Sequence, residues 1–195
     1  EPNLKWRTFS KTVAKVARDH GVESVIHIGA LLDAVPHTRP VKLSGTASQP
    51  RLSEFLESQG IRSSNYQGPT GISSAVMEAC INEGMEYTSI WGHTSHYLQA
   101  APNHQVGSTL LQILLKLLNV RLDLTELQSA AATFNDEVAK AVAKDDQISS
   151  YVTKLEGQYD EAVAAIDIPD PAELVRDLEL FLRGEQRRPP TDPSS

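Results

Sequence analysis

The stretch N-E-G-M-E-Y-T-S-I-W-G at residues 82–92 decides the fold, because the chain repeats its pattern twice more. The related stretches are D-H-G-V-E-S-V-I-H-I-G at 19–29 and S-Q-G-I-R-S-S-N-Y-Q-G at 58–68. In each, a glycine is followed by an aliphatic or methionine residue, a charge, a short run and a second glycine. The glycine pairs are Gly21/Gly29, Gly60/Gly68 and Gly84/Gly92.

The first glycine of each pair is predicted to end a helix. Apolar residues recur at helical spacing just before it, and a glycine takes up the left-handed conformation after a helix at least cost. The runs that follow at 24–28 and 87–91 are β-branched or aromatic and predict short buried strands. The middle run, 63–66, is polar and resembles a strand least. The predicted helices cover residues 4–19, 51–59 and 72–83.

Helix, turn and strand in repeated order predict an α/β domain with a largely parallel sheet and flanking helices. The second glycine of each pair is predicted to mark the carboxyl end of a strand. Ligands bind at that edge in open α/β sheets. Three loops should therefore lie along one edge of the sheet, starting at Gly29, Gly68 and Gly92.

The chain changes character after residue 122. Before it, residues 106–119 are apolar almost all round and predict a buried helix. After it, two helices with apolar stripes are expected, the second capped by Asp146. Prolines then precede a last helix at 172–183. The predicted organisation is an α/β domain at 1–122, a helical extension at 123–184 and a disordered tail at 185–195.

The apolar stripes of the extension predict self-association. Two such stripes bury each other, but a helical hairpin leaves a second apolar edge that either the α/β domain or another subunit must cover. Because the helix at 106–119 looks enclosed already, another subunit is favoured and a homo-oligomer is expected. The stripes are Leu127, Phe134, Val138 and Val142, then Ile148, Val152, Leu155 and Tyr159.

Charge and composition exclude several classes of partner. Residues 1–120 hold 10 Lys/Arg against 9 Asp/Glu, and residues 121–195 hold 8 against 16, which gives +1 and −8. Neither half has the clustered basic face that nucleic acid requires. The longest apolar run, 110–118, is too short to span a membrane. The single cysteine, Cys80, fits a reducing compartment and a core position, so the protein is expected to be cytoplasmic.

The first loop, V-P-H-T-R-P at 35–40, contains candidate catalytic residues. His37 is suited to acid–base chemistry and Arg39 to holding a carboxylate or phosphate. The alternative is an Arg39 that bridges to Asp33 for structural reasons, and the sequence does not separate the two. His96, in the third loop, is a further catalytic candidate.

The second loop, G-P-T-G-I-S-S at 68–74, is a candidate anion site. Glycines allow close backbone approach, and the amides at the start of the next helix point outward. The ligand candidates here are Gly68, Thr70, Gly71 and Ser73. The alternative is favoured, because the loop lacks the phosphate-binding lysine and glycine spacing: Thr70 then caps the helix and the glycines shape the turn.

The third loop, W-G-H-T-S-H-Y at 91–97, adds His93 and Tyr97 as candidate ligand-binding residues. His93, His96 and the later His104 resemble a zinc set. No carboxylate or cysteine lies nearby in sequence, and the spacing follows no known zinc pattern. We therefore expect no metal and no cofactor. Ser44 and Ser73 lie in no G-x-S-x-G motif, so the sequence gives no signal for a serine hydrolase.

Several motifs, in order, resemble the PAC2 family of proteasome-assembly-chaperone-like proteins, most closely its bacterial members. The resemblance covers about residues 1–165. It implies a nucleoside-phosphorylase-like α/β domain that is usually oligomeric. Relative to the family, an early strand and its loop are absent here, and the chain opens directly on a helix, as the later part of a longer protein would. The motifs are V-P-H-T-R-P (35–40), S-G-T-A (44–47), Y-Q-G-P-T-G-I-S (66–73), S-I-W-G-H-T-S-H-Y-L (89–98) and L-L-N-V-R-L-D-L-T-E-L (117–127).

The resemblance favours a non-enzymatic protein-interaction module over an enzyme. Eukaryotic and archaeal relatives assist proteasome assembly, which implies proteasome-related or other protein clients. The alternative is a small-molecule enzyme of phosphorylase or hydrolase type that uses the loops at the carboxyl edge of the sheet.

Overall fold

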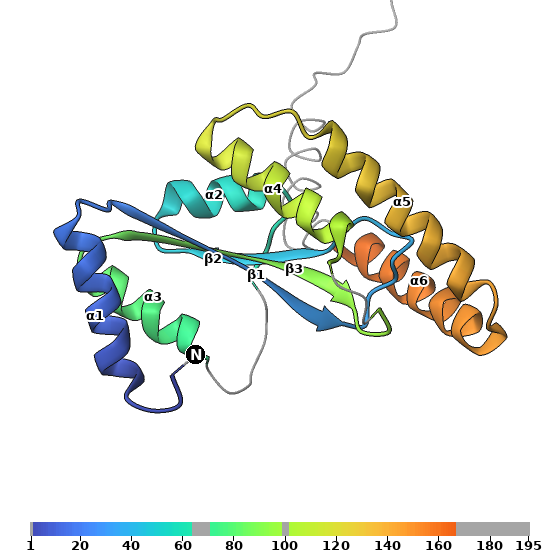
Figure 1. Ribbon diagram of the computed structural model, residues 1–195, viewed down its shortest axis with the longest axis horizontal. Helices are drawn as coiled ribbons and strands as arrows, with labels where there is room; N and C mark the ends of the chain where they lie inside the picture. Colours follow the sequence, from blue (N-terminus) through green and yellow to red (C-terminus); the bar gives the residue numbers. More distant parts are fainter. Residues whose placement is uncertain (1, 64–70, 99–101, 167–195) are drawn as a thin grey trace, which may run out of the picture.

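The computed structural model describes residues 2–63, 71–98 and 102–166. A central sheet separates two pairs of helices, and two further helices extend from one side (Figure 1). The helix at residues 172–183 and the tail at 185–195 fall outside the described residues. The elements in order are α1 (Trp6–Asp19), β1 (Ser24–Asp33), β2 (Leu43–Ala47), α2 (Pro50–Ser58), α3 (Ile72–Asn82), β3 (Glu86–Ser95), α4 (His104–Leu118), α5 (Thr125–Val142) and α6 (Asp146–Ile166).

The three predicted helix ends are confirmed. Gly21, Gly60 and Gly84 have φ values of 73°, 72° and 81°, in the left-handed region that favours glycine. The backbone amide of the residue after each glycine donates to the carbonyl oxygen five residues earlier. Examples are Val22 N–H to Ala17 O and Met85 N–H to Cys80 O. This is the Schellman arrangement, which satisfies carbonyls that a helix end leaves unpaired.

Gly29 and Gly92 do not end strands, and for these two glycines the prediction is wrong. β1 continues from Gly29 to Asp33, and β3 continues from Gly92 to Ser95. Both glycines are needed for close packing instead. A Cβ on Gly29 would lie 2.5 Å from the Trp91 ring, and one on Gly92 would lie 2.5 Å from Val106 Cγ1.

The sheet is mixed rather than largely parallel. β1 pairs with β3 in parallel over ten residues, but β2 pairs with β3 antiparallel, and the order is β1-β3-β2. The middle repeat contributes only a bridge from Arg62 to Ser44. Residues 64–70 lie outside the described part, so Gly68 and its loop are not placed. The loops after Asp33 and Ser95 do leave the same edge, because these two residues are partners in the register.

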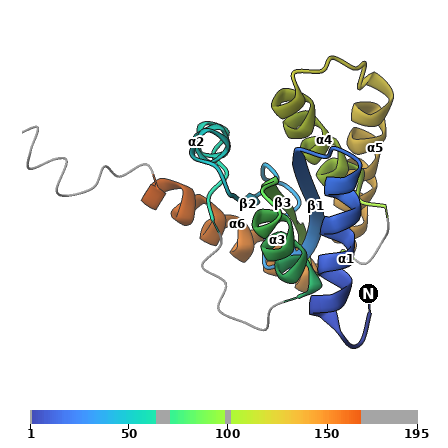
Figure 2. The same cartoon turned by 90° about the vertical axis from the view of Figure 1, so that its left-hand side faces the viewer.

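Each face of the sheet has its own core (Figure 2). On one face α2 and α4 bury Leu56, Ile90 and Leu110 among other residues. On the opposite face α1 packs on α3 around Ala14 and Cys80, which are 0% and 1% exposed. Cys80 is a core residue as predicted, and burial raises the pKa of its thiol. Among the described helices, none combines the length and the apolar character needed to cross a membrane.

The helical extension packs on the α/β domain of its own chain. α5 lies along α4, and α6 reaches the loop that follows β1 (Figure 1). The Phe134 ring packs against the His104 ring. Phe134 is 9% exposed and Leu155 is 2% exposed. The sequence favoured another subunit as the cover for the second apolar edge of this helical hairpin. In the structure α4 of the same chain packs against α5 and covers that edge. The cap of α6 is Asp145, which accepts the amides of Gln147 and Ile148, rather than the predicted Asp146.

Candidate functional site

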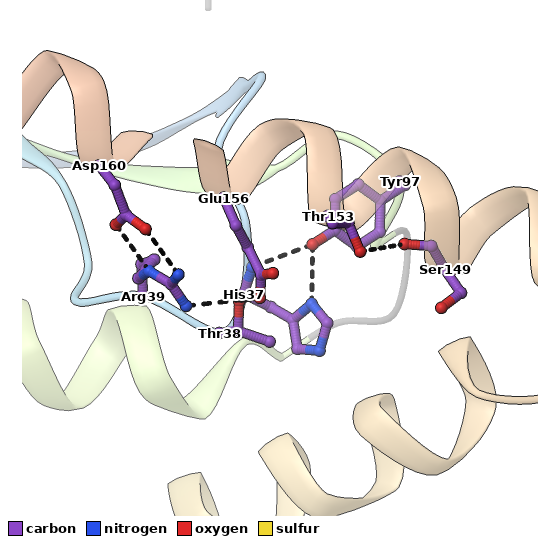
Figure 3. A network of polar contacts seen from close by, with 8 residues as sticks. All are labelled: His37, Thr38, Arg39, Tyr97, Ser149, Thr153, Glu156 and Asp160. Atoms are coloured by element: carbon purple, nitrogen blue, oxygen red, sulfur yellow. Dashed lines mark hydrogen bonds and ion pairs between the residues drawn. The ribbon is translucent and has the colours of Figure 1, made fainter. Parts of the chain in front are cut away.

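Two polar clusters occupy the carboxyl edge of β1 and β3. The first centres on His37, in the loop after β1, and Tyr97, after β3 (Figure 3). The His37 backbone amide donates to the Tyr97 hydroxyl at 2.9 Å, and His37 Nδ1 lies 2.7 Å from the same oxygen. Burial lowers the pKa of His37 although Glu156 acts in the opposite direction. His37 is thus held in place by Tyr97 at the base of the loop.

Arg39 belongs to the same cluster and is bound by α6. Its Nε and Nη2 donate to the two carboxylate oxygens of Asp160 at 2.8 and 2.7 Å, a bidentate pair (Figure 3). Nη1 lies 3.4 Å from Glu156, which also accepts from Thr38. The pair raises the pKa of Arg39 and lowers the pKa of Asp160. The structural alternative, a bridge from Arg39 to Asp33, is not formed, because Arg39 pairs with Asp160 instead.

His96, the third catalytic candidate, also faces α6. Its Nδ1 lies 3.1 Å from the carbonyl oxygen of Asp33, and its Nε2 lies 3.2 Å from the Tyr151 hydroxyl. Tyr159 adds a hydrogen bond from its hydroxyl to the Pro40 carbonyl. We call these contacts between α6 and the loops after β1 and β3 the α6 clamp. In the structure the three catalytic candidates His37, Arg39 and His96 are all members or neighbours of this clamp.

The second cluster joins the three strands through a buried histidine, a buried serine and a partly buried aspartate. His93 Nδ1 lies 2.7 Å from Asp33 Oδ2, and His93 Nε2 lies 2.8 Å from Ser44 Oγ. His93 and Ser44 are 7% and 6% exposed. We call Asp33, His93 and Ser44 the Ser44 relay. Sequence reasoning named only His93 as a site residue, because it placed Asp33 in a loop and did not predict the strand that contains Ser44.

Asp33 is held as a carboxylate within the relay. Partial burial acts against its ionisation, but hydrogen bonds from His93 and Lys42 outweigh this, so the pKa of Asp33 is lowered. Its Oδ1 also accepts the Ala34 amide at 2.7 Å. An ionised carboxylate only accepts hydrogen bonds, so the proton between Asp33 and His93 resides on Nδ1. Nε2, the other ring nitrogen, is then the one that contacts the Ser44 hydroxyl.

Ser44 is the relay residue that lines a cavity of about 270 Å³ next to the first turn of α3. Ser44, Ser73, Ser74 and Trp91 are among its lining residues. Ser73, a predicted ligand residue, is therefore near the relay, whereas the predicted Tyr97 is in the α6 clamp. Gly71 is the N-cap of α3 and offers no side-chain cap. Thr70, predicted to cap this helix, and Gly68 lie outside the described residues.

The three histidines that resemble a zinc set have separate surroundings. His93 contacts Asp33 and Ser44, His96 contacts Tyr151, and His104 packs against Phe134. Within residues 2–63, 71–98 and 102–166, no group of three or more His, Cys, Asp or Glu side chains is arranged to hold a metal ion.

The sequence matches the PAC2 family over residues 1–142, which is well over half of the chain. The chain belongs to the PAC2 family. A PAC2 family protein from Streptomyces avermitilis is 36% identical, with a TM-score of 0.66, and the alignment covers 78% of this chain and 63% of that one. A comparison with curated proteins found no significant match.

Two solved structures from Mycobacterium tuberculosis are also similar to this PAC2 protein. The proteasome-assembly chaperone homologue Rv2125 is 33% identical, with a TM-score of 0.68 over 78% of this chain and 63% of that one. Rv2714, of unknown function, is 28% identical, with a TM-score of 0.75 over 86% of this chain and 56% of that one. The chain therefore spans about three fifths of the length of these relatives.

Proposed function

We propose that this PAC2 protein is an assembly-chaperone-like protein that binds proteasome-related subunits in the cytoplasm and associates with further copies of itself. Family membership and the likeness to a proteasome-assembly chaperone homologue support the chaperone-like role. The α6 clamp supports it as well, because the loop that looked catalytic in the sequence is engaged in holding the helical extension.

The observation that carries the proposal is an exposed apolar stripe on α1. Phe9, Val13 and Val16 are 43%, 38% and 53% exposed, and their spacing places them on one face of the helix. α1 uses a different face, with Ser10 and Ala14 buried, to pack on α3. An exposed apolar patch of this kind marks a protein interaction surface.

The outer edge of β1 extends this surface. Within the described residues β1 pairs only with β3, so its other edge presents unpaired backbone groups. Ile28 and Leu32 on this strand are 39% and 64% exposed. An uncovered edge strand with apolar neighbours favours pairing with another chain. We assign the α1 stripe and this edge to contact between copies of the protein. The acidic extension is then the surface that we assign to client binding.

The experiment compares Val13→Asp/Val16→Asp with Lys11→Asp, on another face of α1. Both changes add two negative units of charge, so the variants are matched. Light scattering should show an oligomer for the wild type and for Lys11→Asp. The double variant should associate about a hundredfold more weakly, because burying two valines contributes roughly 3 kcal/mol.

Client binding is measured with the same proteins by cross-linking and mass spectrometry in the native lysate. Proteasome-related subunits should be recovered with the wild type. A monomeric wild type, or an oligomer that survives in the double variant, contradicts the assigned self-contact. Recovery of no such subunits contradicts the chaperone-like role.

A further inference from the structure

We propose that the Ser44 relay is a catalytic site that hydrolyses small carboxylic esters, with Ser44 as the nucleophile, His93 as the base and Asp33 as the orienting carboxylate. This activity is separate from protein binding by the α1 stripe, and neither depends on the other.

The order of groups is the one that nucleophilic hydrolysis needs. A serine hydroxyl becomes reactive when a base within hydrogen-bond reach takes its proton and a third group orients the base. The 2.8 Å contact from Ser44 Oγ to His93 Nε2 and the 2.7 Å contact from His93 Nδ1 to Asp33 meet both conditions. The proton shared with Asp33 is on Nδ1, so Nε2 is the ring nitrogen that faces Ser44, and Nε2 of an imidazole in this tautomer takes up a proton.

The relay is rigid because three paired strands carry it. Asp33 is the last residue of β1, His93 is in β3, and Ser44 is in β2 opposite Trp91. Lys42 donates to Asp33 Oδ2, the oxygen that His93 also contacts, and the Ala34 amide donates to Oδ1, so both carboxylate oxygens are held. A fixed geometry of this kind contributes to catalysis, because little ordering is left for the reaction step.

The cavity supplies a place for a small substrate. Its volume of about 270 Å³ is slightly below the range of about 300–1,000 Å³ usual for ligand pockets, which favours a short acyl group. Met77 and Trp91 give it apolar walls, and Ser73 and Ser74 line it from the first turn of α3. These hydroxyls and the positive end of the helix dipole are suited to the negative charge that develops on the carbonyl oxygen.

The reaction needs only an ester and water. Ser44 Oγ forms a bond to the carbonyl carbon as its proton passes to His93 Nε2, and the carbonyl electron pair moves to oxygen. The pair returns as the bond to the alcohol oxygen breaks, and the alcohol leaves with the proton from His93. Water then attacks the acyl-serine, again through His93, and releases the carboxylic acid and Ser44.

The full chain is tested with p-nitrophenyl acetate and with a fluorophosphonate probe that forms an adduct with activated serines. The wild type should hydrolyse the ester and carry the probe on Ser44, located by mass spectrometry. Ser44→Ala should lose both, and Asp33→Asn should lower kcat by roughly a thousandfold or more. Ser10→Ala removes an equally buried hydroxyl in α1, away from the cavity, and should match the wild type.

Thermal unfolding of each variant separates loss of activity from loss of fold. A folded Ser44→Ala variant that hydrolyses the ester as fast as the wild type overturns the proposal. So does a wild type that carries no probe on Ser44, since a relay with a purely structural role leaves the serine unreactive.

Discussion

The α6 clamp and the Ser44 relay lie at the same edge of the sheet but put similar residue types to different uses. The clamp is solvent-facing: the side chains of Arg39 and Asp160 are 32% and 54% exposed. The relay is enclosed at its centre, where the His93 side chain is 6% exposed, although its Asp33 side chain is 30% exposed. Exposed ion pairs fix orientation but contribute little net stability, whereas a buried polar group must be satisfied or it destabilises the fold.

The apolar contacts of the helical extension and the ion pairs of the α6 clamp have different roles. The apolar residues on α5 and α6, such as Phe134 and Leu155, leave water almost completely. Arg39 and its carboxylate partners then select one position of α6 over the loop. We therefore expect the clamp to matter less for stability than the apolar contacts behind it.

The largest effect is expected from Leu155→Asp, which places an unpaired charge in the contact of the extension. The free energy of unfolding should fall by about 3 kcal/mol or more. Chemical denaturation measures the loss, and hydrogen exchange should show it in α5 and α6 rather than in the sheet. Lys154→Asp, at an exposed neighbouring position, is the control and should change stability little. Equal exchange in the sheet and the extension would show that the two regions unfold together.

A smaller effect is expected from Asp33→Asn, which removes the charge at the centre of the relay. Loss of the charged hydrogen bonds to His93 and Lys42 should destabilise the protein by about 2 kcal/mol at neutral pH. Asp136→Asn changes an exposed carboxylate on α5 by the same charge and serves as the control. If Asp33→Asn were as stable as Asp136→Asn, the conclusion that Asp33 is ionised and fully hydrogen-bonded would be contradicted.

The same variant gives a pH dependence with a defined sign. The pKa of folded Asp33 is below its ordinary value of 3.8. Its contribution is therefore complete above that value and is lost as pH falls through the lower folded pKa. The stability difference between wild type and Asp33→Asn, followed by denaturation from about pH 6 to about pH 2, should narrow toward the acid end.

The smallest effect is expected from Arg39→Lys, which replaces the bidentate fork by a single ammonium group. The denaturation midpoint should fall less than for either change above. The difference from wild type should disappear in about 1 M salt, where exposed charges are screened. Arg121→Lys, at an exposed position before α5, is the control. A large drop that salt does not remove would place the clamp among the main contributors to stability.

The sequence by itself determined the local structure of this protein. The repeated glycines marked three helix ends because the Schellman hydrogen bonds span only six residues, so a local pattern contains the whole motif. The helical stripes were visible for the same reason, and the motifs at 35–40 and 89–98 led to the PAC2 family. Cys80 was assigned to the core because it lies in the middle of a predicted helix with no basic neighbour that would make its thiol reactive.

Only the tertiary structure decided how these elements meet. β2 is five residues of L-S-G-T-A and has no strong pattern, so its antiparallel place beside β3 depends on the sheet around it. The pattern predicted strand ends at Gly29 and Gly92. These positions require glycine for another reason, because Trp91 and Val106 pack so closely that a Cβ would not fit. The Ser44 relay joins residues up to 60 positions apart, and Arg39 meets Asp160 across 121. Such contacts depend on long-range packing, which the spacing of neighbouring residues does not encode.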